Sequence, residues 1–102
     1  MSVLFAIQNW FQSQCDGDWE HGFGVKIETL DNPGWKVEIN LQETNMENKV
    51  FTEIEDLAPD QSWIHCRVVD GKFKGYGGAL MLENILITFL NWACPEWKEQ
   101  IK

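Results

Sequence analysis

Residues 15–22 form a stretch of this sequence that is dense in side chains capable of chemistry. Within it lie three carboxylates, one imidazole and one indole, contributed by Asp16, Asp18, Glu20, His21 and Trp19. Carboxylates and imidazoles coordinate divalent metals and transfer protons, whereas an acidic loop with a large aromatic ring can anchor another protein. Composition alone therefore leaves a metal site, an acid–base enzyme and a protein-binding surface open.

The spacing of these residues disfavours the first two classes. An EF-hand calcium loop that started at Asp16 would need a glycine where His21 stands and a glutamate where Ile27 stands. His21 and His65 are the only histidines, so neither an HExxH motif nor a three-histidine site can form. We therefore expect no enzymatic activity, no metal and no cofactor. The alternative that stays open is a small metal-binding or hydrolytic enzyme that uses the loop of residues 16–21.

The net charge of −8 is unevenly distributed along the chain. Residues 1–62 hold twelve Asp and Glu but only three Lys. Nucleic acids and anionic membranes require a basic footprint, so we expect direct binding to neither and favour a basic protein partner. No apolar run is long enough to span a bilayer, and the apolar segment 3–7 lacks the positive region of a signal peptide. We expect a cytoplasmic protein whose three cysteines are reduced thiols.

The hydrophobic pattern predicts one α+β domain over residues 1–102. A helix is expected over 2–14 with Ser2 as its cap, and a second over 79–93, ended by Pro95. Between them the period changes to two, which predicts an antiparallel sheet of four to five strands. The predicted strands cover 23–28, 35–41, 49–56, 63–69 and 72–76, with turns at 31–34 and 70–71. Both helices should pack on one face of the sheet.

The opposite face of that sheet should be exposed to solvent. Strand alternation assigns to it Trp63, His65 and Arg67, together with charged residues of the other strands (Lys26, Glu28, Lys36, Glu38, Glu53, Glu55). An exposed Trp beside His and Arg is typical of binding surfaces. Each candidate also has a structural alternative: Trp19 can fill the edge of the core, Asp16 or Asp18 can cap a turn, and His65 can be an ordinary surface residue.

Several ordered motifs resemble the immunity protein 53 family along nearly the whole chain. They are Cys15-Asp16-Gly17-Asp18-Trp19-Glu20-His21, Ile27-Glu28-Thr29-Leu30-Asp31-Asn32-Pro33-Gly34-Trp35, Trp63-Ile64-His65-Cys66-Arg67-Val68, and Gly77-Gly78 ahead of Leu82-Glu83-Asn84-Ile85-Leu86. The resemblance implies a small cytosolic bacterial protein that neutralises the toxin domain of a polymorphic toxin system. It implies a role as a toxin inhibitor, and it names no mechanism.

Residues and resemblance together predict a partner-binding surface for a cognate toxin domain. Against a nuclease, acidic side chains can substitute for the phosphate backbone and accelerate association, so a basic toxin or a nuclease would fit. The predicted contact residues are Asp16, Asp18, Trp19, Glu20, His21, Trp63, His65 and Arg67. The wide apolar arc of the helix over 79–93 could additionally contact the first helix or form a homodimer.

Overall fold

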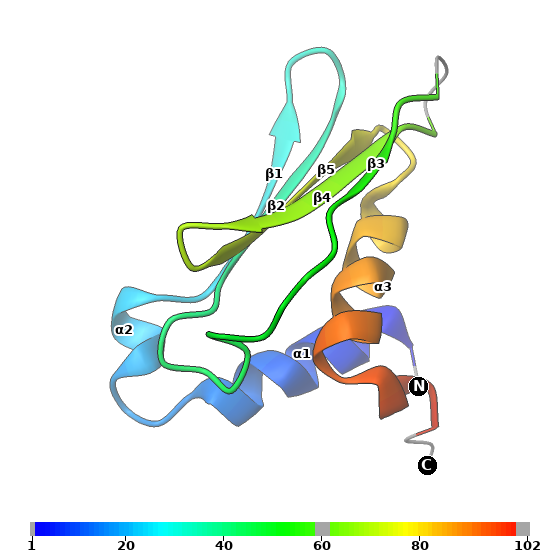
Figure 1. The fold of residues 1–102 in the computed structure, drawn as a ribbon. Coiled ribbons are helices and arrows are strands. Elements are labelled where there is room, and N and C mark those ends of the chain that lie inside the picture. Colours follow the sequence, from blue (N-terminus) through cyan, green and yellow to red (C-terminus); the bar gives the residue numbers. More distant parts are fainter. Residues whose placement is uncertain (1, 59–61, 100–102) are drawn as a thin grey trace.

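The computed structural model describes residues 2–58 and 62–99, which form one antiparallel sheet with its long helices on one face (Figure 1). The elements are α1 (Val3–Gln14), α2 (Trp19–Gly22), β1 (Val25–Leu30), β2 (Gly34–Asn40), β3 (Ile54–Asp56), β4 (Ile64–Val69), β5 (Lys72–Gly78), α3 (Leu82–Ala93) and the 3₁₀ helix η1 (Pro95–Glu99). The five strands lie in the order β1-β2-β5-β4-β3. The predicted α+β class is confirmed.

Local signals in the sequence account for the first helix and the tightest turn. Ser2 caps α1, because its Oγ accepts a hydrogen bond from the Phe5 N–H at 3.1 Å. Asp70 and Gly71 connect β4 to β5 with φ angles of 56° and 72°, as a two-residue hairpin turn requires. That turn fixes the register, so that Val69 lies opposite Lys72 and Arg67 lies opposite Lys74.

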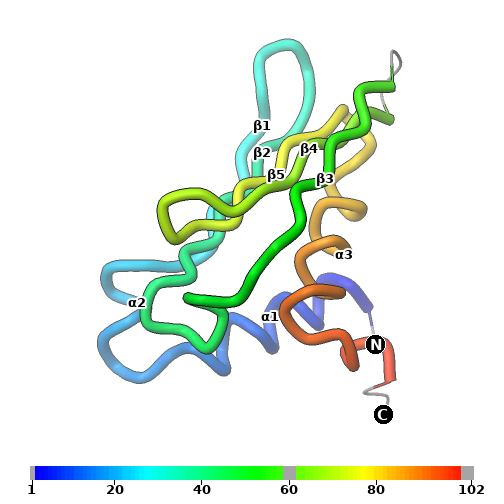
Figure 2. The backbone as a smooth tube through the Cα atoms, viewed as in Figure 1, coloured from blue at the N-terminus to red at the C-terminus, as the bar shows by residue number. Residues whose placement is uncertain are grey.

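The predicted strand over residues 49–56 is partly wrong. Only Ile54–Asp56 pair with β4, and the chain before them runs beside α3 instead (Figure 2). Trp92 of α3 donates its indole N–H to the Val50 carbonyl at 2.8 Å, and the Lys49 ammonium donates to the Trp92 carbonyl at 2.8 Å. Phe51 is therefore partly buried against the core, whereas Val50 is 84% exposed.

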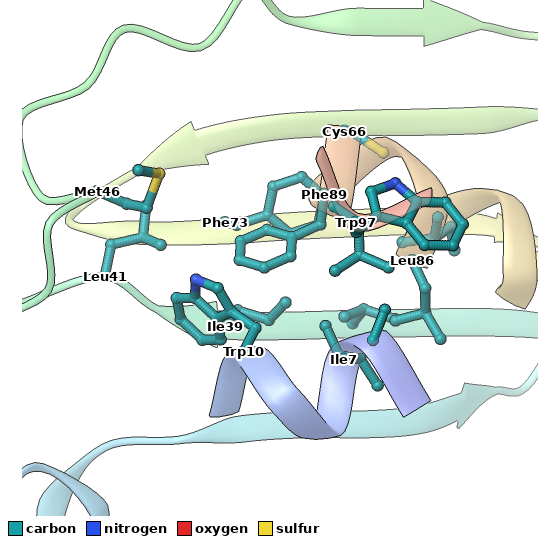
Figure 3. Packing of buried hydrophobic residues seen from close by; sticks show 14 of the residues in the cluster. Ile7, Trp10, Ile39, Leu41, Met46, Cys66, Phe73, Leu86, Phe89 and Trp97 are labelled. Atoms are coloured by element: carbon teal, nitrogen blue, oxygen red, sulfur yellow. The ribbon is translucent and has the colours of Figure 1, made fainter. Parts of the chain in front are cut away.

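The core lies between the inner sheet face and the helices, and several aromatic rings pack there among aliphatic side chains (Figure 3). Phe89 of α3 meets Trp10 of α1 at 4.9 Å and Phe73 of β5 at 5.1 Å between ring centroids, both nearly edge to face. Such pairs contribute about 0.5–1.5 kcal/mol each beyond the apolar area that they bury. Because these rings come from α1, β5 and α3, they join the three elements.

Gly75 lies where α3 approaches the inner face of β5 most closely. A Cβ at this position would overlap the Ile85 Cγ2 atom, and Ile85 is fully buried. We expect Gly75→Ala to lower the free energy of unfolding by about 1–3 kcal/mol, the usual cost of overpacking a core. Gly22→Ala is the matched control, because a Cβ there meets nothing within 4 Å. Urea denaturation of both variants checks the prediction, and equal stability would contradict it.

Candidate functional site

The acidic loop is held in shape by its own carboxylates. Asp16 Oδ1 accepts hydrogen bonds from the backbone N–H groups of Asp18 and Trp19, both at 3.0 Å. Glu20 reaches back and accepts from the N–H groups of Asp16 at 3.0 Å and Gly17 at 2.9 Å. This reciprocal arrangement resembles a capping box at the start of α2. The capping alternative therefore holds for Asp16 but not for Asp18, and Glu20 contributes the reciprocal hydrogen bonds.

These hydrogen bonds also stabilise the negative charge of the loop. The backbone N–H groups of Trp19 and Asp18 hold the pKa of Asp16 below its usual value. Hydrogen bonds from the backbone of Glu20 itself, and then from the N–H groups of Asp16 and Gly17, likewise lower the pKa of Glu20. Asp18 and His21 are exposed, and the Asp18 side chain makes no capping hydrogen bond. The loop is therefore ordered and negatively charged, with Asp18 and His21 at its surface.

Trp19 lies in the core rather than on the surface. It is 1% exposed, and its ring lies 6.0 Å from Trp10, 5.8 Å from Phe11 and 6.5 Å from Phe23 between centroids. Trp19 therefore fills the edge of the core, which was the structural alternative for this residue. Because a buried ring cannot meet a partner in this conformation, Trp19 anchors the loop to α1 from within.

The outer sheet face displays the second predicted group of residues. Along β4, His65 and Arg67 point away from the helices, while Cys66 between them is fully buried on the inner face. Alternation back from Ile64 assigns the half-buried Trp63 to the same outer face. His65 Nε2 lies 2.6 Å from Glu53 Oε2, and its ring lies 6.4 Å from that of Tyr76.

This face is more basic than the rest of the molecule. It carries five of the eight basic residues and four of the sixteen acidic ones, namely Lys26, Lys36, Arg67, Lys72 and Lys74 against Glu28, Glu38, Glu53 and Glu55. Glu38 lies 3.4 Å from Lys72 and 3.9 Å from Lys36. Arg67 faces Lys74 directly across the strand pair, and like charges in that position destabilise a sheet. The acidity of the chain lies elsewhere.

A shallow groove of about 260 Å³ lies where the acidic loop meets the outer face. It is lined by Gly22, Phe23, Gly24 and Val25 from the end of the loop, and by Lys26, Glu38, Asn40 and Lys72 from the sheet. Trp63 lies at the other end of the face, where its carbonyl accepts from the Gly78 N–H. The loop and Trp63 thus lie at opposite ends of this surface, whereas Arg67 lies in the same cross-strand row as Lys74, Glu38 and Lys26.

Sequence analysis did not name Lys72, Lys74 and Tyr76 as part of this surface. The Asp70-Gly71 turn contained the necessary signal, because a two-residue hairpin places Lys74 opposite Arg67 and Tyr76 opposite His65. Extending the register across that turn would have found all three.

The remaining nucleophiles and possible ligands are arranged as follows. Burial raises the pKa of Cys66 to about 12. Desolvation, followed by the charges of Glu20 and Asp16, raises the pKa of Cys15. Within residues 2–58 and 62–99, no group of three or more His, Cys, Asp and Glu is placed to hold a metal ion. In the same part of the chain, no helix has the length and apolar character needed to cross a bilayer.

Fold and surface together define a small α+β domain that presents an ordered acidic loop and a sheet face of mixed charge. The immunity protein 53 family model matches residues 4–94, and the chain belongs to this family of immunity proteins. The resemblance seen in the sequence motifs is thereby confirmed. Neither a curated protein nor a solved structure matches the chain.

The hydrogen bonds of the acidic loop predict a pH-dependent contribution to stability. When folding lowers the pKa of a carboxyl, that carboxyl stabilises the fold fully at pH values above its pKa in the unfolded chain, which is about 3.9 for Asp and 4.3 for Glu. The stabilisation is lost as the pH falls through the pKa of the carboxyl in the folded protein. We therefore expect Asp16→Asn/Glu20→Gln to be less stable than the wild type at pH 7. The difference should shrink towards pH 3.

Urea denaturation at both pH values, followed by Trp fluorescence, measures that difference. Asp18→Asn is the control, since its side chain makes no cap hydrogen bond and its removal should change little at either pH. A stability difference independent of pH would contradict the assigned role of the two carboxylates.

Proposed function

We propose that this chain protects the cell that makes it by binding a cognate toxin domain of a polymorphic toxin system and blocking that domain by direct contact. It acts in the cytoplasm as a non-enzymatic inhibitor without a cofactor. The observation that carries this proposal is membership of a family of immunity proteins over residues 4–94. The acidic loop and the outer sheet face supply the physical means.

The proposed contact residues are those members of the two predicted groups whose side chains do not themselves hold the loop in shape. Asp18 and His21 would meet the toxin from the loop, and Trp63, His65 and Arg67 would meet it from the sheet. The other three loop residues would support these contacts without touching the toxin. The hydrogen bonds of Asp16 and Glu20 and the burial of Trp19 fix the shape of the loop. A surface that is ordered before binding loses little conformational entropy on association, which favours tight complexes.

The charge distribution supports a partner with two kinds of surface. The loop and the net charge of −8 would attract a basic region, such as the cleft of a nuclease. Arg67 and Lys74 lie opposite each other and have no acidic partner within hydrogen-bonding or ion-pairing distance among the described residues. An acidic patch on the toxin would relieve their mutual repulsion. The same net charge disfavours nucleic acid or an anionic membrane as the direct target.

Growth rescue tests the proposal first. Bacteria that express the toxin domain encoded beside this protein's gene should stop growing, and co-expression of this chain should restore growth. The two proteins should also purify as a complex. Gly75→Ala, which we expect to weaken the fold, is a control that shows how far rescue falls when less folded protein is present. Failure of folded, abundant wild-type protein to rescue or to bind would contradict the proposal.

Charge reversal on the outer face tests the proposed surface. Arg67→Glu should raise the Kd for the toxin about tenfold or more, because an acidic region opposite it would become repulsive. Lys98→Glu makes the same change of charge in η1, away from the sheet, and should leave the Kd within a factor of about two. Titration calorimetry or biolayer interferometry measures both values. Equal Kd values for the two variants would exclude this face as the contact.

A further inference from the structure

β1 is a long, regular and open edge of the sheet. Its six residues, Val25–Leu30, pair with β2 on one side, and no described segment pairs with the other side (Figure 1). The opposite edge, β3, has only three residues. Open edges are usually protected by a short strand, a proline, a bulge or charged side chains, and of these β1 has only the charged side chains of Lys26 and Glu28. β1 contains no proline, and its register with β2 is continuous.

The hydrogen-bonding pattern identifies which backbone groups of β1 are free. The Asn40 N–H donates to the Gly24 carbonyl at 3.0 Å, so Gly24 faces β2. In an antiparallel pair this orientation alternates, and Lys26 and Glu28 therefore bond to β2 as well. Val25, Ile27 and Thr29 consequently direct their N–H and C=O groups towards the open edge.

The side chains of β1 divide between two faces. Ile27 lies on the inner face, opposite Val37, and is 42% exposed although it is aliphatic. Lys26 and Glu28 lie on the outer face and are exposed. The strand thus combines an uncovered apolar side chain with one basic and one acidic residue two positions apart.

We propose that β1 pairs antiparallel with β1 of a second copy of this chain, with Ile27 at the two-fold axis. In this register Ile27 faces Ile27 of the second copy, and Val25 faces Thr29. These are the residues whose backbone groups are free, so they form the hydrogen-bonded pairs. Lys26 then faces Glu28 of the second copy on each side of the axis, in the closer, non-hydrogen-bonded positions.

Charge complementarity selects this register over its neighbours. Centring the pair on Lys26 would place two ammonium groups opposite each other, and centring it on Glu28 would place two carboxylates opposite each other. Centring it on Val25 or Thr29 would shorten the paired region. Only the Ile27 register gives opposite charges along the strand, and this self-complementarity specifies a second copy as the occupant.

The pairing would join the two sheets into one and leave the sheet part of the proposed toxin surface accessible. Arg67 and Trp63 belong to β4 and its approach, and β2 and β5 separate β4 from β1. A contact confined to one strand pair buries less than about 1,000 Å², so a weak dimer that forms with increasing concentration is expected. This inference is independent of toxin binding.

Sedimentation velocity over a concentration series, on the full chain, tests the dimer. The wild type should shift from monomer to dimer, whereas Lys26→Glu alone and Glu28→Lys alone should each raise the dimer dissociation constant about tenfold or more through like-charge repulsion. An equimolar mixture of the two variants should restore association, because each acidic strand then meets a basic one. Lys98→Glu, a reversal away from β1, should dimerise like the wild type.

Ile27→Pro tests the backbone contribution. The Ile27 N–H takes no part in the β1–β2 ladder, and proline is tolerated on edge strands with the N–H side outward. The variant should fold, as circular dichroism would report, and remain monomeric. A monomeric wild type at all concentrations, a mixture that does not associate, or a dimer unaffected by Ile27→Pro would overturn the proposal. The proposal would also be overturned if substitutions in β1 abolished toxin binding while the wild type stayed monomeric. The open edge would then be a contact surface for the toxin and not for a second copy.

Discussion

The close approach of α3 to the inner face of β5 positions the rest of the structure. Gly75 and Gly77 leave two positions of that face without side chains, and Ile85 fills the space over them. A Cβ on Gly77 would lie 2.9 Å from the Met81 Cβ, so the residue that precedes α3 also lies close to the strand. Because a core at native packing density cannot absorb even one extra methyl group without strain, these two glycines set the distance between helix and sheet.

Contacts between aromatic rings connect α3 to the acidic loop, so the position of α3 also determines the position of the loop. Phe89 contacts Trp10 of α1, and Trp10 in turn contacts Trp19 at the start of α2. Trp19 belongs to the same short segment whose backbone Asp16 and Glu20 hold. The position of the surface loop therefore depends on packing in the centre of the molecule. A substitution in the core can change the loop without touching it.

Much of the fold could be predicted because its signals are local. Ser2, the Asp70-Gly71 turn and the period-two strands each determine their structure within a few residues, and alternation along β4 correctly separated His65 and Arg67 from Cys66. The segment before β3 could not be predicted in the same way. Phe51 packs against the core because Trp92, far away in the sequence, contacts its ring and binds the backbone of its neighbour Val50. Such a tertiary contact leaves no local pattern.

The acidic loop shows a different limit of prediction. Its composition singled out a group of candidate residues, but composition cannot say whether a carboxylate faces a partner or its own backbone. The carboxylates of Asp16 and Glu20 face their own backbone. That this chain contacts the toxin remains a prediction, and it now concerns Asp18, His21, Trp63, His65 and Arg67. The missed residues Lys72, Lys74 and Tyr76 were predictable in principle, since the register of the β4–β5 hairpin follows from its two-residue turn.

The structural and functional interpretations of the loop support each other. Backbone N–H groups stabilise the Asp16 and Glu20 carboxylates in their ionised form, so the hydrogen bonds that order the loop also preserve its negative charge. A flexible acidic loop would have the same charge, but it would lose conformational entropy when it met a partner. Here that entropy is lost during folding, where the burial of Trp19 offsets it. A capped loop is therefore a better binding element than a free one, and capping does not argue against a role in recognition.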